Sequence, residues 1–269
     1  IHGHAELQDP HTITVGTQTY TSERIVVATG GWPFVPEIPG AEHAATSNEA
    51  FFLESLPRRV VVVGGGYIAV EFAGIFNGLG VDTTQVYRGP LFLRGFDDDL
   101  RSFLAKEMDK NGITLLFNTD ITQITAKGSS YQTALDNGNS LECDLVMYAT
   151  GRKPIVTGFG LENCGVEINR DGAIIVDSNY RTNVDSIYAI GDVTNRVNLT
   201  PVAIAEGMAL AYHLYKDEGR PVDYEYVPSA VFSDPNLGTV GYTEAEAKEK
   251  FGELTIYMSS FSPLKHSLS

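Results

Sequence analysis

Residues 59–69 read RVVVVGGGYIA, and they give the clearest indication of the fold in the sequence. The run of β-branched residues before the glycines predicts a buried parallel strand. Residues 68–76 are apolar at helical spacing and contain no proline, which predicts a helix directly after the turn. Strand, glycine turn with G-x-G-x-x-A spacing, and helix follow each other without a gap, as in dinucleotide-binding units.

Each small residue of this turn has a physical task. Gly64 permits the tight turn, and Gly66 has no Cβ, so that a pyrophosphate can lie against the backbone. Ala69 lets the helix pack close to the strand. The free N–H groups and the positive end of the helix dipole are then expected to face the phosphates.

The next strand decides which dinucleotide is bound. Residues 81–87 predict this strand, and an NAD site would carry an acid near its end, about 20 residues past the glycines. Arg88 stands there instead, and Arg94 follows in the same loop. Two guanidinium groups can hold a 2′-phosphate by charge-assisted hydrogen bonds, which favours NADPH. The alternative is that both are solvated loop cations.

The composition of the chain argues against several classes of binding partner. The 269 residues hold 34 acids and 19 Lys and Arg, a net charge of −15, which argues against nucleic acid or an anionic membrane as partner. No apolar run reaches the length of a membrane span. Cys143 and Cys164 form no C-x-x-C pair, so they predict buried, inert thiols and a cytoplasmic protein, although a lone disulfide stays an alternative. Nothing in the sequence predicts a metal site.

The remaining pattern predicts an α/β chain. Strands are expected at 12–15, 18–21, 24–28, 113–117, 121–125, 131–135 and 145–149. A helix is expected at 98–111, with Leu100, Phe103, Leu104 and Met108 on its apolar face. Another is expected at 201–215, capped by Thr200, and a third at 244–251 among strands at 230–233, 237–241 and 254–260. Residues 59–151 are expected to form a nearly free-standing nucleotide-binding domain.

Three strand ends share one design. Residues 27–30 (VATG), 148–151 (YATG) and 188–192 (YAIGD) each finish an apolar strand with a small residue and a glycine, where backbone can approach a ligand. In this order around a glycine turn, they resemble the flavoprotein disulfide reductases. Residues 66–71 (GYIAVE), 199–203 (LTPVA) and 238–241 (GTVG), with the two arginines, resemble the glutathione reductases within that group.

The resemblance implies a Rossmann-like NAD(P)-binding domain, part of an FAD-binding domain and the start of an α+β dimerisation domain. Residues 1–57 and 153–225 would belong to the FAD-binding domain, 58–152 to the NADPH-binding domain, and 226–269 to the dimerisation domain. A homodimer of the whole protein would pass a hydride from NADPH to FAD, then through a dithiol to glutathione disulfide. The alternatives are a related reductase acting on lipoamide or trypanothione, and a nicotinamide-binding module without redox chemistry.

The resemblance also implies roles for particular residues. Tyr67 would cover the flavin until nicotinamide displaces it, and Glu71 would pair with a lysine beside the flavin; both would be catalytic. Asp192 would hold a ribityl hydroxyl, and Thr200 would present its backbone N–H to the flavin. The implied dinucleotide-binding residues are Gly64, Gly65, Gly66, Ile68, Ala69, Glu71, Arg88, Arg94, Gly151, Asn198 and Val231, and the implied FAD-binding residues are Ala5, Thr29, Gly30, Asp192 and Thr200.

Several family motifs have no counterpart in these 269 residues. The flavin-binding G-x-G-x-x-G, the redox C-x-x-x-x-C and its neighbouring lysine would lie upstream. The catalytic His-Pro pair would lie downstream, and His266 does not match it because serine follows. We therefore expect these residues alone to bind FAD weakly and not to reduce glutathione disulfide.

Overall fold

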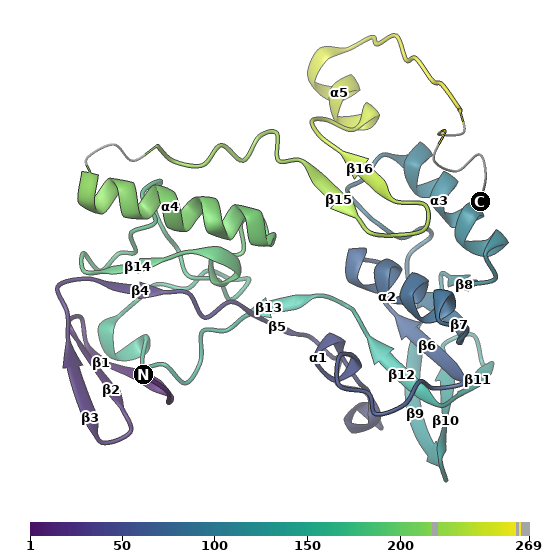
Figure 1. Ribbon diagram of the computed structural model, residues 1–269, viewed down its shortest axis with the longest axis horizontal. Coiled ribbons are helices and arrows are strands. Elements are labelled where there is room, and N and C mark those ends of the chain that lie inside the picture. The colour runs from purple at the N-terminus through teal and green to yellow at the C-terminus, as the bar shows by residue number, and fades with distance from the viewer. Residues whose placement is uncertain (217–219, 262–263, 265–269) are drawn as a thin grey trace.

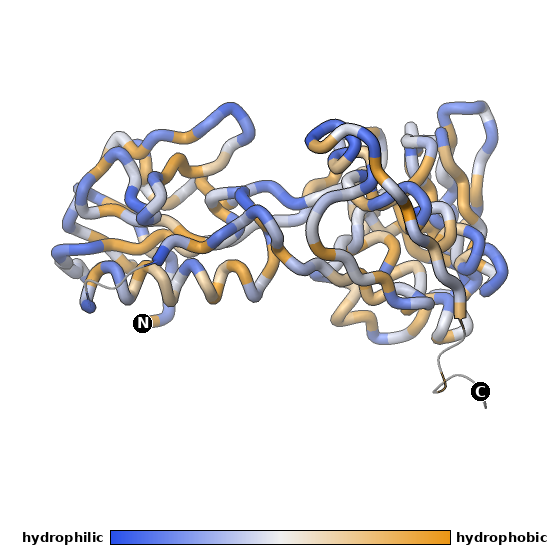
Figure 2. The backbone as a smooth tube through the Cα atoms, turned by 90° about the horizontal axis from the view of Figure 1, so that it is seen from above, coloured by the Kyte–Doolittle hydropathy of each residue, from blue (hydrophilic) through white to orange (hydrophobic). Residues whose placement is uncertain are grey.

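The computed structural model describes residues 1–216, 220–261 and 264. These residues form two lobes, which are bridged by a short antiparallel pair of strands (Figure 1). The pair consists of β5 (Gly31–Pro33) and β13 (Arg152–Pro154), with Arg152 opposite Pro33. Each lobe holds apolar cores, and hydrophobic segments alternate with hydrophilic ones along the chain in both lobes (Figure 2).

One lobe is built on a parallel sheet with the strand order β12-β6-β7-β8. These strands span Leu145–Tyr148, Arg59–Val63, Asp82–Tyr87 and Thr114–Phe117. Val60 and Val62 of β6 belong to the apolar core shared with α2 (Tyr67–Gly78) and α3 (Asp98–Lys110). Val61 and Val63 belong to a second core on the opposite face. Burial of both faces explains why β6 is a continuous valine run rather than an alternating one.

The second core is covered by a three-stranded antiparallel meander. Its strands are β9 (Ile121–Lys127), β10 (Ser130–Leu135) and β11 (Ser140–Cys143). Ile38 and Ala44 also pack there, from the segment that holds a short 3-10 turn (Ala41–His43) and α1 (Ser47–Ala50).

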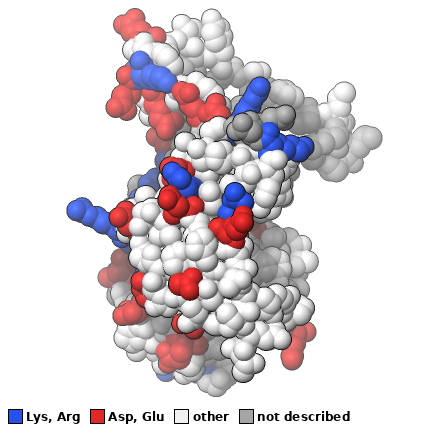
Figure 3. Space-filling model, turned by 90° about the vertical axis from the view of Figure 1, so that its left-hand side faces the viewer, with Lys and Arg blue, Asp and Glu red and all other residues white. Residues whose placement is uncertain are grey.

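The other lobe holds β1 (Ala5–Asp9), β2 (Thr12–Val15) and β3 (Gln18–Thr21) in one antiparallel sheet. In a second, two-stranded sheet, β4 (Ile25–Val27) pairs in parallel with β14 (Ile187–Ala189). Helix α4 (Thr200–Lys216) packs beside this pair, and short 3-10 turns span Glu162–Cys164 and Gly191–Thr194. Acidic and basic side chains are interspersed on the face shown in Figure 3.

The predicted α/β class is confirmed, and three details of the prediction are wrong. Leu100 and Phe103 are 37% and 53% exposed, so of the four residues expected on the apolar face of α3 just Leu104 and Met108 are buried. Helix α4 begins at Thr200, because the Ala203 N–H already donates to the Leu199 carbonyl; Leu199, not Thr200, holds the cap position. Residues 254–260 form no strand, because no other described segment pairs with their backbone.

Residues 59–151, which were expected to form a nearly free-standing domain, share their core with residues from outside this range. After α4 the chain crosses to the other lobe, where β15 (Ser229–Val231) and β16 (Leu237–Thr239) form a hairpin (Figure 1). Val231 is fully buried and Leu237 is 7% exposed, and both pack into the core shared by α2 and α3. Helix α5 (Glu244–Phe251) follows. None of the helices in the described part of the chain combines the length and apolarity needed to cross a membrane.

Candidate functional site

A cavity of about 400 Å³ opens where strands β6, β7 and β12 end. Ligands bind to open parallel sheets at the carboxyl ends of their strands, and this volume suits a small-molecule site. The cavity brings together many of the residues predicted from sequence. They are Gly64, Gly65, Gly66, Tyr67, Ile68, Arg88, Arg94, Gly151 and Asn198.

The three glycines of the turn are needed for different reasons. Gly64 has a φ of 144°, and a Cβ there would lie 2.3 Å from the Ala149 carbonyl oxygen. A Cβ on buried Gly65 would lie 2.5 Å from the ring of Tyr87, which also leaves no room for a Cβ on Gly89. Gly66 is exposed and has open space where a Cβ would stand, so it can face a ligand. Gly66 caps α2 without a side-chain hydrogen bond, which leaves the first N–H groups of the helix available.

The loop after β7 presents two unpaired cations to this cavity. Arg88 and Arg94 are exposed, and neither guanidinium has an ion-pair or hydrogen-bond partner among the described residues. Arg101 differs, because its Nε and Nη2 donate to the carbonyls of Phe92 and Leu91, both at 2.6 Å. Arg101 therefore fixes the loop, while the other two arginines line the cavity.

Tyr67 and Asn198 meet at the side of the cavity nearest the other lobe. The Tyr67 hydroxyl donates to the Asn198 carbonyl at 3.5 Å, and burial, helped by nearby Asp192, raises the pKa of Tyr67. The side-chain oxygen Oδ1 of Asn198 is buried and has no partner among the described residues. A buried acceptor left unpaired costs about 1–3 kcal/mol, so this position fits a hydrogen-bond donor from a bound molecule.

Three of the predicted dinucleotide-binding residues lie outside the cavity lining. Ala69 is fully buried and packs α2 against the sheet. The side chain of Val231 is enclosed in the core, so a ligand could contact only its backbone. Glu71 is half-buried on α2, and its Oε1 accepts a hydrogen bond of 2.9 Å from the Phe232 N–H. Glu71 thereby ties α2 to the end of β15.

The predicted FAD residues lie in the other lobe, and none lines the cavity. Thr29 and Gly30 follow β4, and the Thr29 hydroxyl donates to the Ile155 carbonyl at 2.6 Å. Asp192 lies beside them, because a Cβ on Gly31 would stand 3.6 Å from the Asp192 Cβ. No described contact joins exposed Ala5 or Thr200 to this group. The adjacent ends of β4 and β14 therefore bring Thr29, Gly30 and Asp192, three of the five predicted FAD-binding residues, close together.

A buried carboxylate behind Asp192 escaped prediction. Glu206 on α4 is 1% exposed; its Oε2 accepts from the Gly191 N–H and its Oε1 from the Tyr224 hydroxyl, both at 2.6 Å. Arg196 donates to the same hydroxyl at 3.2 Å. Burial and Glu206 raise the pKa of Tyr224. The sequence did offer a signal, because Glu206 is a single acid within the apolar stretch of α4. Glu71 stands in a similar apolar stretch of α2.

Arg152 is a further lining residue that sequence reasoning missed. It lies in the cavity wall, and its Nη2 donates to the Gly31 carbonyl in the paired strand β5. A cation directly after the strand-end motif at 148–151 was the available signal.

The two cysteines are free and lie in different lobes, so the alternative of a disulfide between them is excluded. Cys143 is fully buried, and burial raises the pKa of its thiol to about 11. Burial also raises the pKa of half-buried Cys164. Because the thiolate is the reactive form, both thiols are poor nucleophiles.

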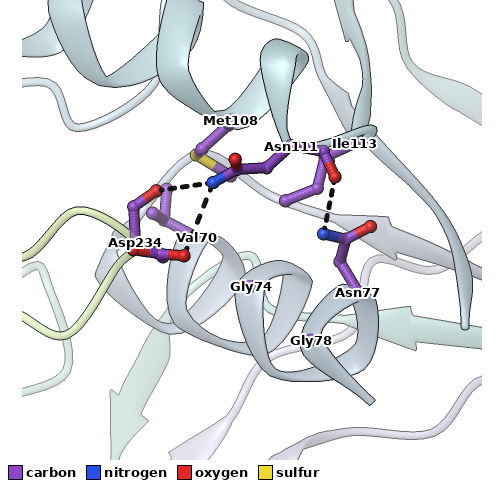
Figure 4. A pocket seen from close by; sticks show the side chains of 8 residues that line it. All are labelled: Val70, Gly74, Asn77, Gly78, Met108, Asn111, Ile113 and Asp234. Atoms are coloured by element: carbon purple, nitrogen blue, oxygen red, sulfur yellow. Dashed lines mark hydrogen bonds between the residues drawn. The ribbon is translucent and has the colours of Figure 1, made fainter. Parts of the chain in front are cut away.

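A second cavity, of about 240 Å³, lies between α2, α3 and the turn after β15 (Figure 4). The Asn111 side-chain amide donates to the Asp234 carbonyl at 3.4 Å and to its carboxylate at 3.5 Å. Asn77 donates to the Asn111 carbonyl at 3.0 Å. These groups pair with each other, so they fasten the hairpin to the two helices.

Comparison with known proteins identifies the family to which the chain is related. The pyridine nucleotide-disulphide oxidoreductase family matches residues 1–207, and its dimerisation domain matches residues 227–269. A glutathione reductase of Burkholderia cepacia is 44% identical over 99% of this chain, and a trypanothione reductase of Trypanosoma congolense is 47% identical over 92%. The chain spans 60% and 51% of the lengths of these two relatives.

A solved structure agrees with the sequence comparison. The HOCl-induced flavoprotein disulfide reductase RclA from Escherichia coli superposes with a TM-score of 0.88 at 31% identity, covering 93% of this chain and 58% of that one. Its fold therefore extends over both lobes of the present structure. Together with the matches at 1–207 and 227–269, this shows that the chain belongs to the pyridine nucleotide-disulphide oxidoreductase family.

Proposed function

We propose that the chain binds NADPH in the 400 Å³ cavity and forms part of an FAD-containing reductase of glutathione disulfide. One observation carries the proposal. Arg88 and Arg94, which have no ion-pair or hydrogen-bond partner among the described residues, line the same cavity as a glycine turn at the start of a helix. The curated relatives named glutathione reductase, at 41–44% identity, support the choice of substrate.

The residues of the cavity suggest how they would hold NADPH. The N–H groups at the start of α2, around Gly66, would bind the pyrophosphate. Arg88 and Arg94 would bind the 2′-phosphate, which NADH lacks. Asn198 would offer its unpaired oxygen to a donor on the cofactor. Tyr67 would cover the flavin, and Glu71 would lie near the nicotinamide.

The residues around the ends of β4 and β14 suggest part of an FAD site. Thr29, Gly30 and Asp192 lie together there, and Thr200 opens α4, whose positive end would stabilise negative charge on a bound ring. Ala5 would contribute at the adenosine end. When bound, NADPH supplies a hydride and FAD accepts it; the protein provides binding, orientation and shielding from water.

The proposal extends to domains, assembly and location. Residues 1–57 and 153–225 would bind FAD, 58–152 would bind NADPH, and 226–269 would join two subunits of the whole protein. The match of residues 227–269 to a dimerisation domain supports the homodimer. The two free thiols support a cytoplasmic setting.

Reduction of trypanothione disulfide is the second candidate, because a trypanothione reductase is 47% identical. The two candidates share the cofactor cavity and differ in the disulfide. A full-length protein containing this sequence, supplied with NADPH and FAD, should be assayed with glutathione disulfide, trypanothione disulfide and lipoamide. Faster turnover of glutathione disulfide would support the first candidate, and faster turnover of either other disulfide would contradict it.

Cofactor binding can be tested on the 269-residue chain itself. Titration with NADPH and with NADH, followed by the fluorescence of the reduced nicotinamide, should give a clear preference for NADPH. The preference should shrink as salt is added, because exposed charge pairs are screened. Equal affinities for the two nucleotides would refute the assignment of NADPH.

A further inference from the structure

The glycine turn has a buried partner outside the cavity. Gln85 on β7 is 1% exposed, and its Nε2 donates to the Gly64 carbonyl at 3.0 Å. The amide orientation follows from this contact, because only the NH₂ end can bond to a carbonyl oxygen. The other end, Oε1, has no partner among the described residues. A polar side chain retained here, with one end unpaired, points to a task for the paired end.

The backbone of the turn shows what that task is. The Gly64 carbonyl accepts from Gln85, the Gly65 carbonyl from the Leu93 N–H at 2.6 Å, and the Gly66 carbonyl from the Val70 N–H at 3.2 Å. None of these three donors belongs to a residue that lines the cavity. All three carbonyls of the turn therefore accept hydrogen bonds from groups outside the cavity lining, which directs their negative ends away from the cavity. Only the Gly64 carbonyl depends on a side chain.

We propose that Gln85 is a positioning residue of the dinucleotide site, which holds the Gly64 carbonyl inward so that the turn presents only N–H groups to a pyrophosphate. The inference rests on the proposed binding of NADPH. The pyrophosphate is common to NADPH and NADH, so loss of the Gln85 hydrogen bond should weaken the binding of both nucleotides alike. The two arginines, in contrast, should affect only the phosphorylated one.

Two variants and a matched control test this role in the 269-residue chain. Gln85→Met keeps an unbranched side chain of similar length and removes the donor. Thr83→Val is the control: Thr83 is fully buried on the same strand and face, and its hydroxyl donates to the Val81 carbonyl at 2.9 Å, away from the turn. We expect Gln85→Met to raise Kd about three- to tenfold for NADP⁺ and NAD⁺ alike, as the loss of one hydrogen bond does. Thr83→Val should leave both values unchanged.

Gln85→Glu adds a readout that simple loss of packing would not produce. An ionised carboxylate cannot donate to the Gly64 carbonyl, whereas a protonated carboxyl can. The ratio of its Kd to that of the wild type, measured at each pH by calorimetry with NADP⁺, should therefore fall as the pH falls. Dividing by the wild-type value cancels titration of the nucleotide phosphates. The same variant serves if Gln85→Met does not fold, because its low-pH form restores the donor.

The outcomes distinguish failure of the positioning role from failure of the proposed function. Wild-type chain that binds neither nucleotide refutes the proposed function, and the role of Gln85 with it. Three outcomes would refute the positioning role alone, provided that the wild-type chain binds. The Kd of Gln85→Met could equal that of the wild type, or Thr83→Val could weaken binding as much as Gln85→Met does. The Kd ratio of Gln85→Glu could also be independent of pH. Selective weakening of NADP⁺ by Gln85→Met would also refute it, since the pyrophosphate is common to both nucleotides.

Discussion

At the scale of single residues, we propose that the choice of nucleotide depends on Arg88 and Arg94, whose side chains have no partners among the described residues. Arg88→Glu should weaken NADPH by about 10- to 100-fold, because hydrogen bonds to a charged group contribute about 1.5–3 kcal/mol each and the new carboxylate repels the phosphate. NADH should bind as well as before, or better. Arg170→Glu, an equal change of charge at an exposed loop position outside the cavity, is the control. If Arg88→Glu weakened the binding of both nucleotides equally, the arginine would not be the group that binds the 2′-phosphate.

Glu206 gives a second prediction at this scale. Glu206→Leu would remove the acceptor of the Gly191 N–H and the acceptor of the Tyr224 hydroxyl proton, although Arg196 would still donate to that hydroxyl. A buried donor left without an acceptor costs about 1–3 kcal/mol. We expect the free energy of unfolding in urea to fall by about 2–5 kcal/mol. Tyr224→Phe, which keeps the hydrogen bond from the Gly191 N–H to Glu206 and removes the hydroxyl that pairs with Glu206 and Arg196, should cost less. An unfolding midpoint for Glu206→Leu equal to that of the wild type would contradict this expectation.

At the scale of elements, the end of the parallel sheet should respond to pH. Asp144 accepts from the Arg59 backbone and guanidinium, both at 3.0 Å, and the guanidinium hydrogen bond holds the pKa of Asp144 below its ordinary 3.8. A lowered folded-state pKa contributes stability that is present above the unfolded pKa and is lost as the pH falls through the folded value. The Arg59 side chain is 37% exposed, so we expect only about 1 kcal/mol at neutral pH, after solvent screening.

The measurement compares Asp144→Asn with the wild type by urea unfolding from about pH 6 to about pH 3. The difference in unfolding free energy should shrink toward zero as the pH falls. Glu142→Gln is the matched control, because Glu142 pairs with the same guanidinium at 3.1 Å but is 62% exposed. A difference that grows on acidification would mean that the Asp144 carboxylate does not stabilise the fold through its ionised form.

The sequence predicted elements well where local pattern determines them. The strands and helix around the glycine turn, the hairpin at 12–21 and the helix at 244–251 all form. Patterns that depend on distant partners were misread: Phe103 has no described segment to bury it, and residues 254–260 have none to pair with. The cavity residues near the turn were predictable, whereas Arg152, Gln85 and Glu206 owe their roles to neighbours brought in by tertiary structure.

At the scale of the whole molecule, the β15–β16 hairpin completes a core to which it is not adjacent in sequence. An excised piece containing residues 58–152 would lose the buried contacts of Val231 and Leu237 and the hydrogen bond from Phe232 to Glu71. We expect such a piece to unfold at lower urea concentration than the 269-residue chain and to bind a dye specific for exposed apolar surface. Equal stability and no dye binding would show that the hairpin is dispensable.

The ring of Tyr87 has an evolutionary consequence. It occupies the space that a Cβ on Gly65 would need, at 2.5 Å, and the space that a Cβ on Gly89 would need, at 2.6 Å. These three positions are therefore coupled: a side chain at either glycine would require the aromatic ring to move aside or to be replaced by something smaller. A substitution at either glycine should therefore be accompanied by a change at position 87, whether or not the glycines ever touch a nucleotide.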